Sequence, residues 1–485
     1  MSPSLLLLLL LLLYCFPFSL AAAAGDHSDS FVFEFHRRPA LPGLDLARQL
    51  LLDDKLRQRT IRARLEHARH RRRACGVPHA PAPAPAPTSF DMPLNSGAYA
   101  GAGQYFVRFQ LGTPAQRFEL VADTGSDLTW AKCRRRGDDA KSVSGRAFLP
   151  AESSSFRPIL CSSDMCRNSL PFSLTTCPTP ASPCAYDYGG SEAAVDNHSF
   201  MKKKFTVGLT ACDRRYSDGS AAHGIFANES ATVILSDGRR RKLRGLVVGC
   251  TSSAVGSSFR ASDGVLGLGY SDISFAYRAG GHFAYCMVDH LSPRNATGFL
   301  AFGPAPAPPP PTAGRRWRET AISLDVEPFY GVGVRGISVD GEMLPIPASV
   351  WDLAAGGGAI LDSGTSLTVL AEPAYRAVVE ALTRRLAWAP RVRVEPFEHC
   401  YNWSTGAPAV LPRMAVHLEG TARLAPPSKS YVIDVAEGVK CLGIVAAPWP
   451  SFSTIGNILQ QEHLWEFDVA NRRLRFRRST CRKRR

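Results

Sequence analysis

The chain has 485 residues, of which 45% are hydrophobic and 20% are charged. These proportions exclude a disordered chain and allow two sizeable cores. The formal net charge is +15, and the 40 Gly and 36 Pro residues favour a turn-rich, mainly β protein.

The sequence begins with an apolar segment. Leu5–Leu13 is an unbroken run of Leu, and the small residues Ala21–Ala24 follow it. This pattern predicts a signal peptide over residues 1–24. No later stretch of the sequence is long and apolar enough to span a bilayer, so we expect a secreted protein, with the vacuole or a plastid as alternative destinations.

Residues 25–94 have the composition of a removable propeptide, because an Arg-rich segment is followed by a stiff Pro/Ala linker at 81–87. Apolar residues in this segment have approximately helical spacing: Leu46, Leu50, Leu56, Ile61 and Leu65. Its Arg residues could pair with a carboxylate cleft, which makes the propeptide a candidate inhibitor of the rest of the chain. A solvated helical arm without an inhibitory role is the alternative.

Two short motifs carry the clearest chemistry. Asp123–Ser126 reads Asp-Thr-Gly-Ser and Asp362–Thr365 reads Asp-Ser-Gly-Thr, and 239 residues separate the two Asp residues. An apolar run precedes each motif, which predicts a buried strand that delivers a carboxylate into a tight Gly turn. One such motif alone is usually only a turn, but two copies with matched flanks predict a paired site.

Two carboxylates held close together cannot both ionise cheaply, so such a pair shares one proton. The charged member can then deprotonate a water while the protonated member hydrogen-bonds a carbonyl. The paired motifs therefore predict hydrolysis in acid without a covalent intermediate. The sequence contains no HExxH, GxxxxGK[ST] or GxSxG motif, and we expect neither a metal nor a cofactor.

The residues around the first motif resemble a known family. Gly103–Val107 (GQYFV), Leu111–Gln116 (LGTPAQ) and Asp127–Trp130 (DLTW) occur in the order found in pepsin-like aspartic proteases, and most closely in the plant nepenthesin-type branch. The resemblance extends from Gln104 to Phe476. It implies a mainly β, bilobal fold with the active site in the cleft between two β lobes, and an aspartic endopeptidase that hydrolyses peptide bonds at acidic pH.

The same resemblance implies roles for individual residues. Asp123 and Asp362 would be the catalytic pair. The hydroxyls of Ser126 and Thr365 would orient the outer carboxylate oxygens. The remaining motif residues complete the two turns, with Thr124 and Ser363 bonding across to the opposite lobe and Gly125 and Gly364 as the Gly positions.

Tyr216–Ser220 (YSDGS) resembles the flap hairpin of the family, whose Tyr216 would close over the substrate and hydrogen-bond Trp130. The alternative is an ordinary hairpin turn, since Asp-Gly is itself a strong turn signal. The Gly-containing apolar stretches Asp263–Gly269 and Thr454–Gln461 resemble the segments that pack beside the two catalytic turns. Without the resemblance, they would be buried strands in which Gly permits close approach of backbones.

Residues 189–214 depart from the family pattern. Relatives pass almost directly from Tyr188 to Arg215, so we interpret this stretch as an inserted or unspliced segment within the flap hairpin. If translated, it could splay the flap and impair closure over the substrate. The remaining domains are expected at 95–303 for the N-terminal lobe, 304–316 for a Pro-rich linker, and 317–485 for the C-terminal lobe with a basic tail.

The 13 Cys residues predict disulfides in an oxidising compartment. Loss of the signal peptide and propeptide removes Cys15 and Cys75, and loss of residues 189–214 removes Cys212, which leaves an even number. Family resemblance implies a stapled loop containing Cys161, Cys166, Cys177 and Cys184, and a Cys400–Cys441 bridge. Zinc is the disfavoured alternative for the four-Cys cluster, because no His has ligand spacing there. The partner of Cys133 stays open.

Several surface features bear on partners. The sequons at Asn228, Asn295 and Asn402 predict glycosylation. The basic stretches Arg239–Lys242 and Arg472–Arg485 invite a nucleic-acid interpretation, but little aromatic interleaving and no recognised module argue against it. An acidic cell-wall polysaccharide is the alternative partner, and a simply solvated tail is the third interpretation. We expect a monomer.

The function predicted for the chain is proteolysis of protein or peptide substrates. Apolar side chains are expected to flank the scissile bond, since Tyr216, Trp130 and neighbouring aliphatic residues would line the cleft. The rival from another class is a catalytically silent protease-like protein that binds or inhibits another secreted protein, as certain plant glycosidase inhibitors of related sequence do. The intact pair of Asp motifs favours the enzyme.

Overall fold

The computed structural model describes residues 43–75, 89–135, 145–170, 177–187, 221–255, 259, 261–304, 316–404 and 411–482. Every described residue belongs to one compact unit, residues 40–485. The predicted signal peptide and most of the Pro-rich 304–316 linker lie outside the described residues. No helix among the described residues is both long enough and apolar enough to cross a membrane.

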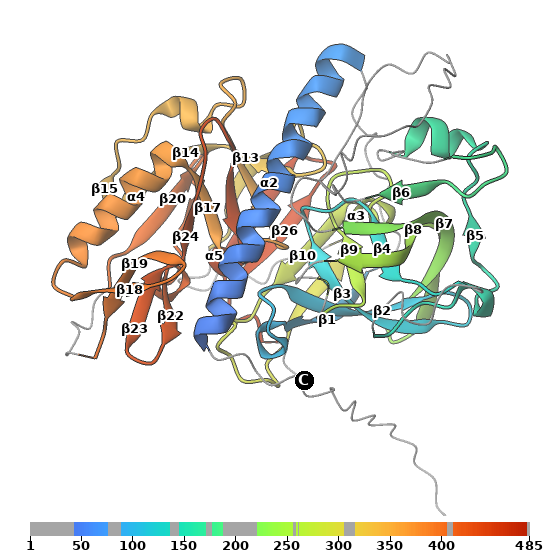
Figure 1. The fold of residues 1–485 in the computed structure, drawn as a ribbon, viewed down its shortest axis with the longest axis horizontal. Coiled ribbons are helices and arrows are strands. Elements are labelled where there is room, and N and C mark those ends of the chain that lie inside the picture. Colours follow the sequence, from blue (N-terminus) through green and yellow to red (C-terminus); the bar gives the residue numbers. More distant parts are fainter. Residues whose placement is uncertain are drawn as a thin grey trace, which may run out of the picture. The chain divides into compact units, whose positions relative to one another are not determined.

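Strands predominate in the described chain, as expected for a mainly β protein (Figure 1). The strands that precede the Pro-rich segment are β1 Phe90–Ser96, β2 Tyr105–Leu111, β3 Gln116–Asp123, β4 Thr129–Lys132, β5 Arg157–Pro158, β6 Ala185–Asp187, β7 Ala221–Ile234, β8 Arg240–Val255, β9 Gly264–Gly267, β10 His282–Cys286 and β11 Gly298–Phe302. One short helix, α3 Phe275–Arg278, lies among them, and the Ser274 side chain caps its N-terminus.

The strands that follow the Pro-rich segment form a second β lobe. They are β12 Arg318–Ser323, β13 Tyr330–Val332, β14 Val334–Val339, β15 Glu342–Met343, β16 Ala359–Asp362, β17 Thr368–Ala371, β18 Arg391–Val394, β19 Phe397–Asn402, β20 Met414–Leu418, β21 Arg423–Leu424, β22 Val432–Ala436, β23 Val439–Leu442, β24 Ile444–Ala447, β25 Ser453–Gly456, β26 His463–Asp468 and β27 Arg473–Arg478. The helices here are α4 Glu372–Arg385 and α5 Asn457–Gln460.

A shared sheet joins the two lobes. β10 of the first lobe pairs with β26 of the second, and Phe283 lies opposite Phe467 with their rings stacked at 4.6 Å. β27 continues the sheet beyond β26 and also pairs with β12. The Tyr330 hydroxyl donates to the Leu268 carbonyl of the other lobe at 2.8 Å. The core therefore runs through the junction, and this continuity fixes how the two lobes face each other.

Each lobe contains the same local arrangement of strands. β3 pairs with β9 in parallel, and β16 pairs with β25 in parallel. All four residues of β9, β16 and β25 are buried, which explains why these strands are continuous apolar runs rather than alternating ones. The segments Asp263–Gly269 and Thr454–Gln461 thus lie beside the two Asp turns, as the sequence analysis expected.

Helix α2, Gly43–Cys75, comes from the predicted propeptide and crosses in front of the strands between the two lobes (Figure 1). Its buried face includes Ala47, Leu51, Asp54, Gln58, Ile61 and Leu65. Of the other apolar residues with helical spacing, Leu56 is 37% exposed, and Leu46 and Leu50 are half-buried. Polar residues occupy the middle of the buried face, where apolar periodicity cannot reveal them.

The expected boundary between propeptide and first lobe at 94/95 falls inside β1. In this strand Phe90, Met92 and Leu94 are buried, and the strand pairs with both β11 and β2. Cutting there would remove most of a strand from the sheet. Residues 76–88, between α2 and β1, lie outside the described residues.

Five disulfides join described residues. Cys161–Cys177 and Cys166–Cys184 staple the four-Cys loop, and Cys400 bonds Cys441. Cys133, whose partner the sequence left open, bonds Cys250. Cys286–Cys481, which the sequence analysis missed, ties β10 to the segment after β27.

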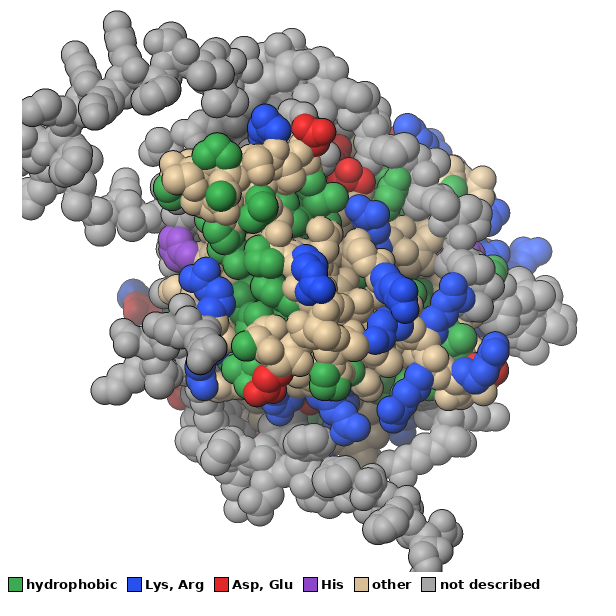
Figure 2. Space-filling view, turned by 90° about the vertical axis from the view of Figure 1, so that its right-hand side faces the viewer, with side chains coloured by type: hydrophobic (Ala, Val, Ile, Leu, Met, Phe, Trp, Pro, Cys, Tyr) green, Lys and Arg blue, Asp and Glu red, His purple; other side chains and the backbone are tan. Residues whose placement is uncertain are grey.

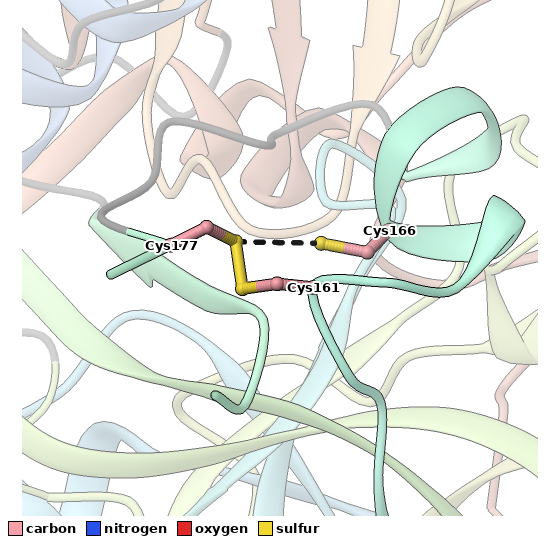
Figure 3. A group of neighbouring side chains, drawn as sticks. All are labelled: Cys161, Cys166 and Cys177. Carbon is pink, nitrogen blue, oxygen red and sulfur yellow. Dashed lines mark hydrogen bonds between the residues drawn. A yellow bond between two sulfur atoms is a disulfide. The ribbon is translucent and has the colours of Figure 1, made fainter. Parts of the chain in front are cut away.

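The sulfur atoms of Cys161, Cys166 and Cys177 form the one group in the described chain with the closeness that a metal site requires (Figure 3). The Cys166 and Cys177 sulfurs are 4.0 Å apart. All three atoms are nevertheless committed to disulfides, and zinc needs thiolates. The cluster is therefore a pair of adjacent staples.

Basic side chains gather on one face of the molecule, where few acidic side chains are visible (Figure 2). On β8 the solvent-facing positions alternate as Arg240, Lys242 and Arg244, all exposed, whereas Leu243 packs on the core. The two-residue period of a strand places those three cations on one side of it. Exposed Arg117 and Arg157 lie on β3 and β5 of the same lobe.

Candidate active site

The two Asp residues occupy equivalent positions at the ends of strands. Asp123 ends β3 opposite Gly267 of β9, and Asp362 ends β16 opposite Gly456 of β25. Their exposed fractions are 2% and 0%. The apolar runs that precede them are buried on both faces, so each carboxylate is delivered into the interior between the lobes.

The turn that follows each Asp supplies matching hydrogen bonds. Asp123 accepts from the Gly125 N–H at 2.9 Å through Oδ1 and from the Ser126 hydroxyl at 2.6 Å through Oδ2. Asp362 accepts from the Gly364 N–H at 2.9 Å and from the Thr365 hydroxyl at 2.5 Å in the same way. The arrangement fixes both carboxylate planes and leaves the Oδ1 atoms facing each other across the cleft.

The second residue of each motif bonds across the junction. The Thr124 N–H donates to the Ser363 hydroxyl and the Ser363 N–H donates to the Thr124 hydroxyl, both at 2.9 Å. Each hydroxyl then donates to a strand carbonyl of the opposite lobe, Thr124 to Leu361 and Ser363 to Ala122. These four reciprocal bonds hold the two turns in register with each other.

The third position of each motif must be Gly. A Cβ on Gly125 would lie 2.7 Å from Oδ1 of Asp362, and one on Gly364 would collide with Asp123. Any larger residue would therefore push the carboxylates apart. Gly is required at both positions because the two carboxylates lie too close to each turn to leave room for a side chain.

Arg57 of α2 inserts its guanidinium between the carboxylates. Nη2 donates to Oδ1 of Asp123 at 2.6 Å and to Oδ1 of Asp362 at 2.9 Å, so one nitrogen bridges the two facing oxygens. Nε donates to Oδ2 of Asp362 at 2.8 Å and to the Thr365 hydroxyl at 3.1 Å. Arg57 therefore occupies the point at which a water would have to sit to contact both acids.

The environment separates the pKa values of the pair. Burial, together with the nearby charge of Asp362, raises the pKa of Asp123 above its ordinary value even though Arg57 opposes the shift. Burial also acts on Asp362, but the Arg57 charge and the hydrogen bonds from Arg57, Thr365 and Gly364 outweigh it and hold that pKa below its ordinary value. The two acids share one site and one cation, so a proton is retained more readily on Asp123.

Trp130 lies on β4 and is 5% exposed, with its ring against Phe259 at 5.0 Å. Tyr216, its expected partner in the flap, lies outside the described residues. The flanking strands are paired, however, since Asp187 of β6 lies opposite His223 of β7. Residues 189–214, which follow β6 in the sequence, also lie outside the described residues.

The sequons at Asn228, Asn295 and Asn402 have different structural surroundings, and a fourth sequon, at Asn197, lies outside the described residues. Asn295 is exposed in a turn, where an oligosaccharide has room. Asn402 is half-buried at the end of β19, and its Oδ1 accepts from the Ser404 N–H at 2.9 Å. Asn228 lies within β7 between two paired strands, and the Glu229 and Ser230 side chains beside it are buried.

The sequence analysis identified the Arg-rich segment as a candidate inhibitor but did not single out Arg57 as the residue that contacts the Asp pair. Several Arg residues occupy α2, and Arg57 alone among the described ones contacts both acids. Asp54, one turn earlier, was not considered at all. Asp54 lies three residues before Arg57 and so on the same face of the helix. This spacing could have indicated a role for Asp54 only if the contact between Arg57 and the Asp pair were already known.

Comparisons with known proteins identify the family to which the chain belongs. Two family models match, one described as xylanase inhibitor N-terminal over residues 105–215 and 209–304, and one described as xylanase inhibitor C-terminal over 329–478. Aspartyl protease family protein 2 of Arabidopsis thaliana is 31% identical over 418 residues, covering 84% of this chain and 76% of the relative. Aspartic proteinase nepenthesin-2 of Nepenthes gracilis is 30% identical over 395 residues, covering 80% of each chain.

Solved structures agree on the fold. The crystal structure of edgp has a TM-score of 0.59 at 20% identity and covers 83% of this chain and 97% of its own. Soybean basic 7S globulin has a TM-score of 0.56 at 17% identity, with 81% and 97% covered. Together with the sequence relatives, these matches show that the chain belongs to the pepsin-like aspartic protease family. Within that family it groups with the plant nepenthesin-type proteins.

Proposed function

We propose that this chain is the inactive precursor of a secreted aspartic endopeptidase, which hydrolyses peptide bonds in acid through water activated by Asp123 and Asp362. The observation that carries the proposal is the pair of facing Oδ1 atoms, each held by a Gly N–H, with hydroxyls on the outer oxygens. Both acids are buried, which strengthens their interaction with each other and with a bound water.

In the proposed reaction, a water replaces the Arg57 nitrogen between the carboxylates. The ionised acid takes a proton from this water as the oxygen attacks the scissile carbonyl carbon, and the protonated acid donates to the carbonyl oxygen. The acid that took the proton from water then gives it to the leaving amine nitrogen as the C–N bond breaks. A diol hydroxyl returns its proton to the other carboxylate as the new carbonyl forms, so the pair again holds one proton. No covalent enzyme intermediate forms, because the attacking oxygen comes from water.

The helix α2 explains why the precursor would be silent. A guanidinium stays protonated throughout the physiological range, so Arg57 cannot leave by losing its own proton. Release instead requires a change on the acids, or displacement of α2 after the chain between α2 and β1 is cut. Five disulfides are consistent with folding in the secretory pathway, where such precursors are processed.

A second candidate function is binding and inhibition of a secreted glycosidase. The observation in its favour is that both matching family models are described as xylanase inhibitor regions. The intact Asp pair and its full set of hydrogen bonds favour the protease.

One experiment separates the two candidates. The chain is folded at full length, cut between α2 and β1, separated from the α2 segment, and incubated with an unfolded protein substrate, with and without pepstatin. The protease proposal predicts pepstatin-sensitive fragments and none from Asp123→Asn. Absence of cleavage together with tight binding to a xylanase would replace it with the inhibitor proposal.

A further inference from the structure

A chain of side-chain hydrogen bonds leads from the first lobe to the second Asp turn. Asn457, the first residue of α5, is fully buried, and its Nδ2 donates to the Ser363 carbonyl at 3.1 Å and to the Gly103 carbonyl at 2.8 Å. His290, in the loop after β10, places Nε2 3.3 Å from Oδ1 of Asn457. Its Nδ1 lies 2.7 Å from the Ser96 hydroxyl. Polar side chains of both lobes therefore connect β1 to the turn that follows β16.

The chemistry of these groups fixes the direction of each bond. Carbonyls only accept, so the Asn457 nitrogen faces the two backbone carbonyls and its oxygen faces His290. That oxygen can also only accept, so the His290 ring carries its proton on Nε2. Nδ1 of the neutral ring then accepts from the Ser96 hydroxyl, whose oxygen accepts in turn from the Ala98 N–H at 3.2 Å. Bonds that run in one direction along such a chain strengthen one another.

The surroundings of His290 keep its ring neutral and in place. The half-buried ring stacks on Tyr105, with 4.8 Å between the ring centroids. Desolvation lowers the pKa of His290 to about 4, although the oxygens around the ring and the Asp289 charge oppose the shift. Asp289 is itself paired with Lys429 of the other lobe. Above that pH, His290 therefore has the single ring proton that the bond to Asn457 requires.

The chain of bonds ends on the peptide group that contacts Asp362. The Ser363 carbonyl and the Gly364 N–H belong to one peptide unit, and this N–H donates to Oδ1 of Asp362 at 2.9 Å. A bond accepted by the carbonyl makes the N–H of the same unit a stronger donor. A stronger donor stabilises the ionised carboxylate, so the bond from Asn457 lowers the affinity of Asp362 for a proton.

The equivalent position of the first lobe has a different chemistry. β9 and β25 pair with the ends of the two strands that deliver the Asp residues. Asn457 directly follows β25, whereas Leu268 directly follows β9. A Leu side chain has no N–H with which to contact the first turn. The two turns match in their own hydrogen bonds, and they differ in the donor that this position supplies.

We propose that His290 is a positioning residue of the active site, which acts on Asp362 through Asn457 and the peptide unit that Asn457 contacts. The proposal rests on the proposed function in that Asp362 is one of the two reacting acids. Without the Nε2 donor, the Asn457 amide loses the bond that polarises it, and the bonds further along the chain weaken as well. Loss of His290 should therefore reach the carboxylate as a weaker bond from the Gly364 N–H.

The first test observes this peptide unit in the uncut chain, without substrate. Cell-free synthesis labels Ser with 13C at the carbonyl and Gly with 15N, so that only Ser-Gly peptide units give a signal in an HNCO spectrum. The sequence contains three such units, which begin at Ser96, Ser144 and Ser363. Ser96→Thr and Ser144→Ala each remove one signal and so identify the third. That signal reports both the carbonyl that accepts from Asn457 and the N–H that donates to Asp362.

Variants of His290 separate its two bonds. His290→Phe keeps a ring on Tyr105 but removes both nitrogens, so we expect the Gly364 proton signal to move to higher field, as for a weaker donor. His290→Gln can place an amide N–H where Nε2 lies and should restore the wild-type signal, whereas His290→Asn reaches only the Nδ1 position and should not. His417→Phe is the matched control, because His417 is also half-buried but bonds Ser338 of β14.

A second test uses the cut protein, freed of α2. His290→Phe should lower kcat/KM at pH 5 about fivefold, which is the effect of one neutral hydrogen bond. It should also move the acid limb of the pH profile to higher pH, because Asp362 with a weaker donor holds its proton more tightly. His290→Gln should restore both the rate and the profile, and His417→Phe should change neither.

The outcomes distinguish the two proposals. An unmoved signal in His290→Phe, or an equal movement in His290→Gln, would overturn the inference. If His290→Phe lowers the melting temperature of the uncut chain, His290→Asn, which keeps a polar side chain, is judged in its place. A signal that moves as expected in a chain that never cleaves protein would refute the proposed function alone. Cleavage of protein by a chain whose signal and pH profile do not respond to His290→Phe would refute this inference alone.

Discussion

Removing the cation from the Asp pair should activate the uncut chain. In Arg57→Gln the two carboxylates lose a guanidinium that makes three bonds to them between 2.6 and 2.9 Å. Breaking a buried ion pair costs about 3–5 kcal/mol, and the 26% exposure of the Arg57 side chain favours the lower end. About 3 kcal/mol weakens docking of the helix by about a hundredfold.

The assay is cleavage of a quenched fluorescent peptide by full-length, uncut protein at pH 5. We expect Arg57→Gln to cleave measurably and the wild type to remain close to background. Arg59→Gln is the matched control, because Arg59 lies on the same helix and is exposed. Equal activity of the two variants, or silence of Arg57→Gln in a chain that becomes active after cutting and removal of the helix, would refute the role assigned to Arg57.

Three further outcomes follow from the geometry. Thr124→Val should lower the free energy of unfolding by about 1–3 kcal/mol in urea titration, because the buried Ser363 N–H loses its acceptor; an unchanged midpoint would contradict the reciprocal bonds. Thermal stability of the uncut chain should be greatest near pH 4 and should fall from there to about pH 8. Burial raises the pKa of Asp54 from 3.8 to about 8, so its contribution to stability is fully present below pH 3.8 and is lost as the pH rises to about 8. The pKa of Asp362 is lowered, so its contribution is present above pH 3.8 and is lost as the pH falls through the lowered pKa. Asp54→Asn should make the fall above pH 4 shallower without changing the loss in acid, and an unchanged fall would refute the assignment. We also propose that the basic face binds an acidic polysaccharide through the exposed cations of β8, namely Arg240, Lys242 and Arg244. Replacing all three by Gln should lower the salt concentration that elutes the protein from immobilised polygalacturonate, without changing cleavage. An unchanged elution concentration would exclude these three residues from the binding surface.

Local motifs made the Asp pair predictable. Asp123 and Asp362 each follow an apolar run and precede Gly within two residues, so strand, turn and carboxylate can be read from a short window. The family resemblance supplied the hydroxyl and cross-lobe bonds. These features depend on contacts within a motif or between its two copies.

Longer-range features could not be read in this way. The role of Arg57 depends on the register of α2, which Asp54 sets through amides more than 300 residues away. The Cys286–Cys481 bridge depends on pairing of β10 with β26, a contact between the two lobes. The buried face of α2 could not be read from apolar spacing, because it contains Asp54 and Gln58, which an apolar pattern treats as surface residues.

The pH dependence of kcat/KM for the cut protein, freed of the helix, tests the shared-proton pair most directly. The account predicts a bell-shaped profile in acid, whose two limbs report ionisation of the first acid and of the second, and loss of activity in both Asp123→Asn and Asp362→Asn. Cleavage that persists in either variant with the wild-type profile would show that another group activates the water, and would contradict the account.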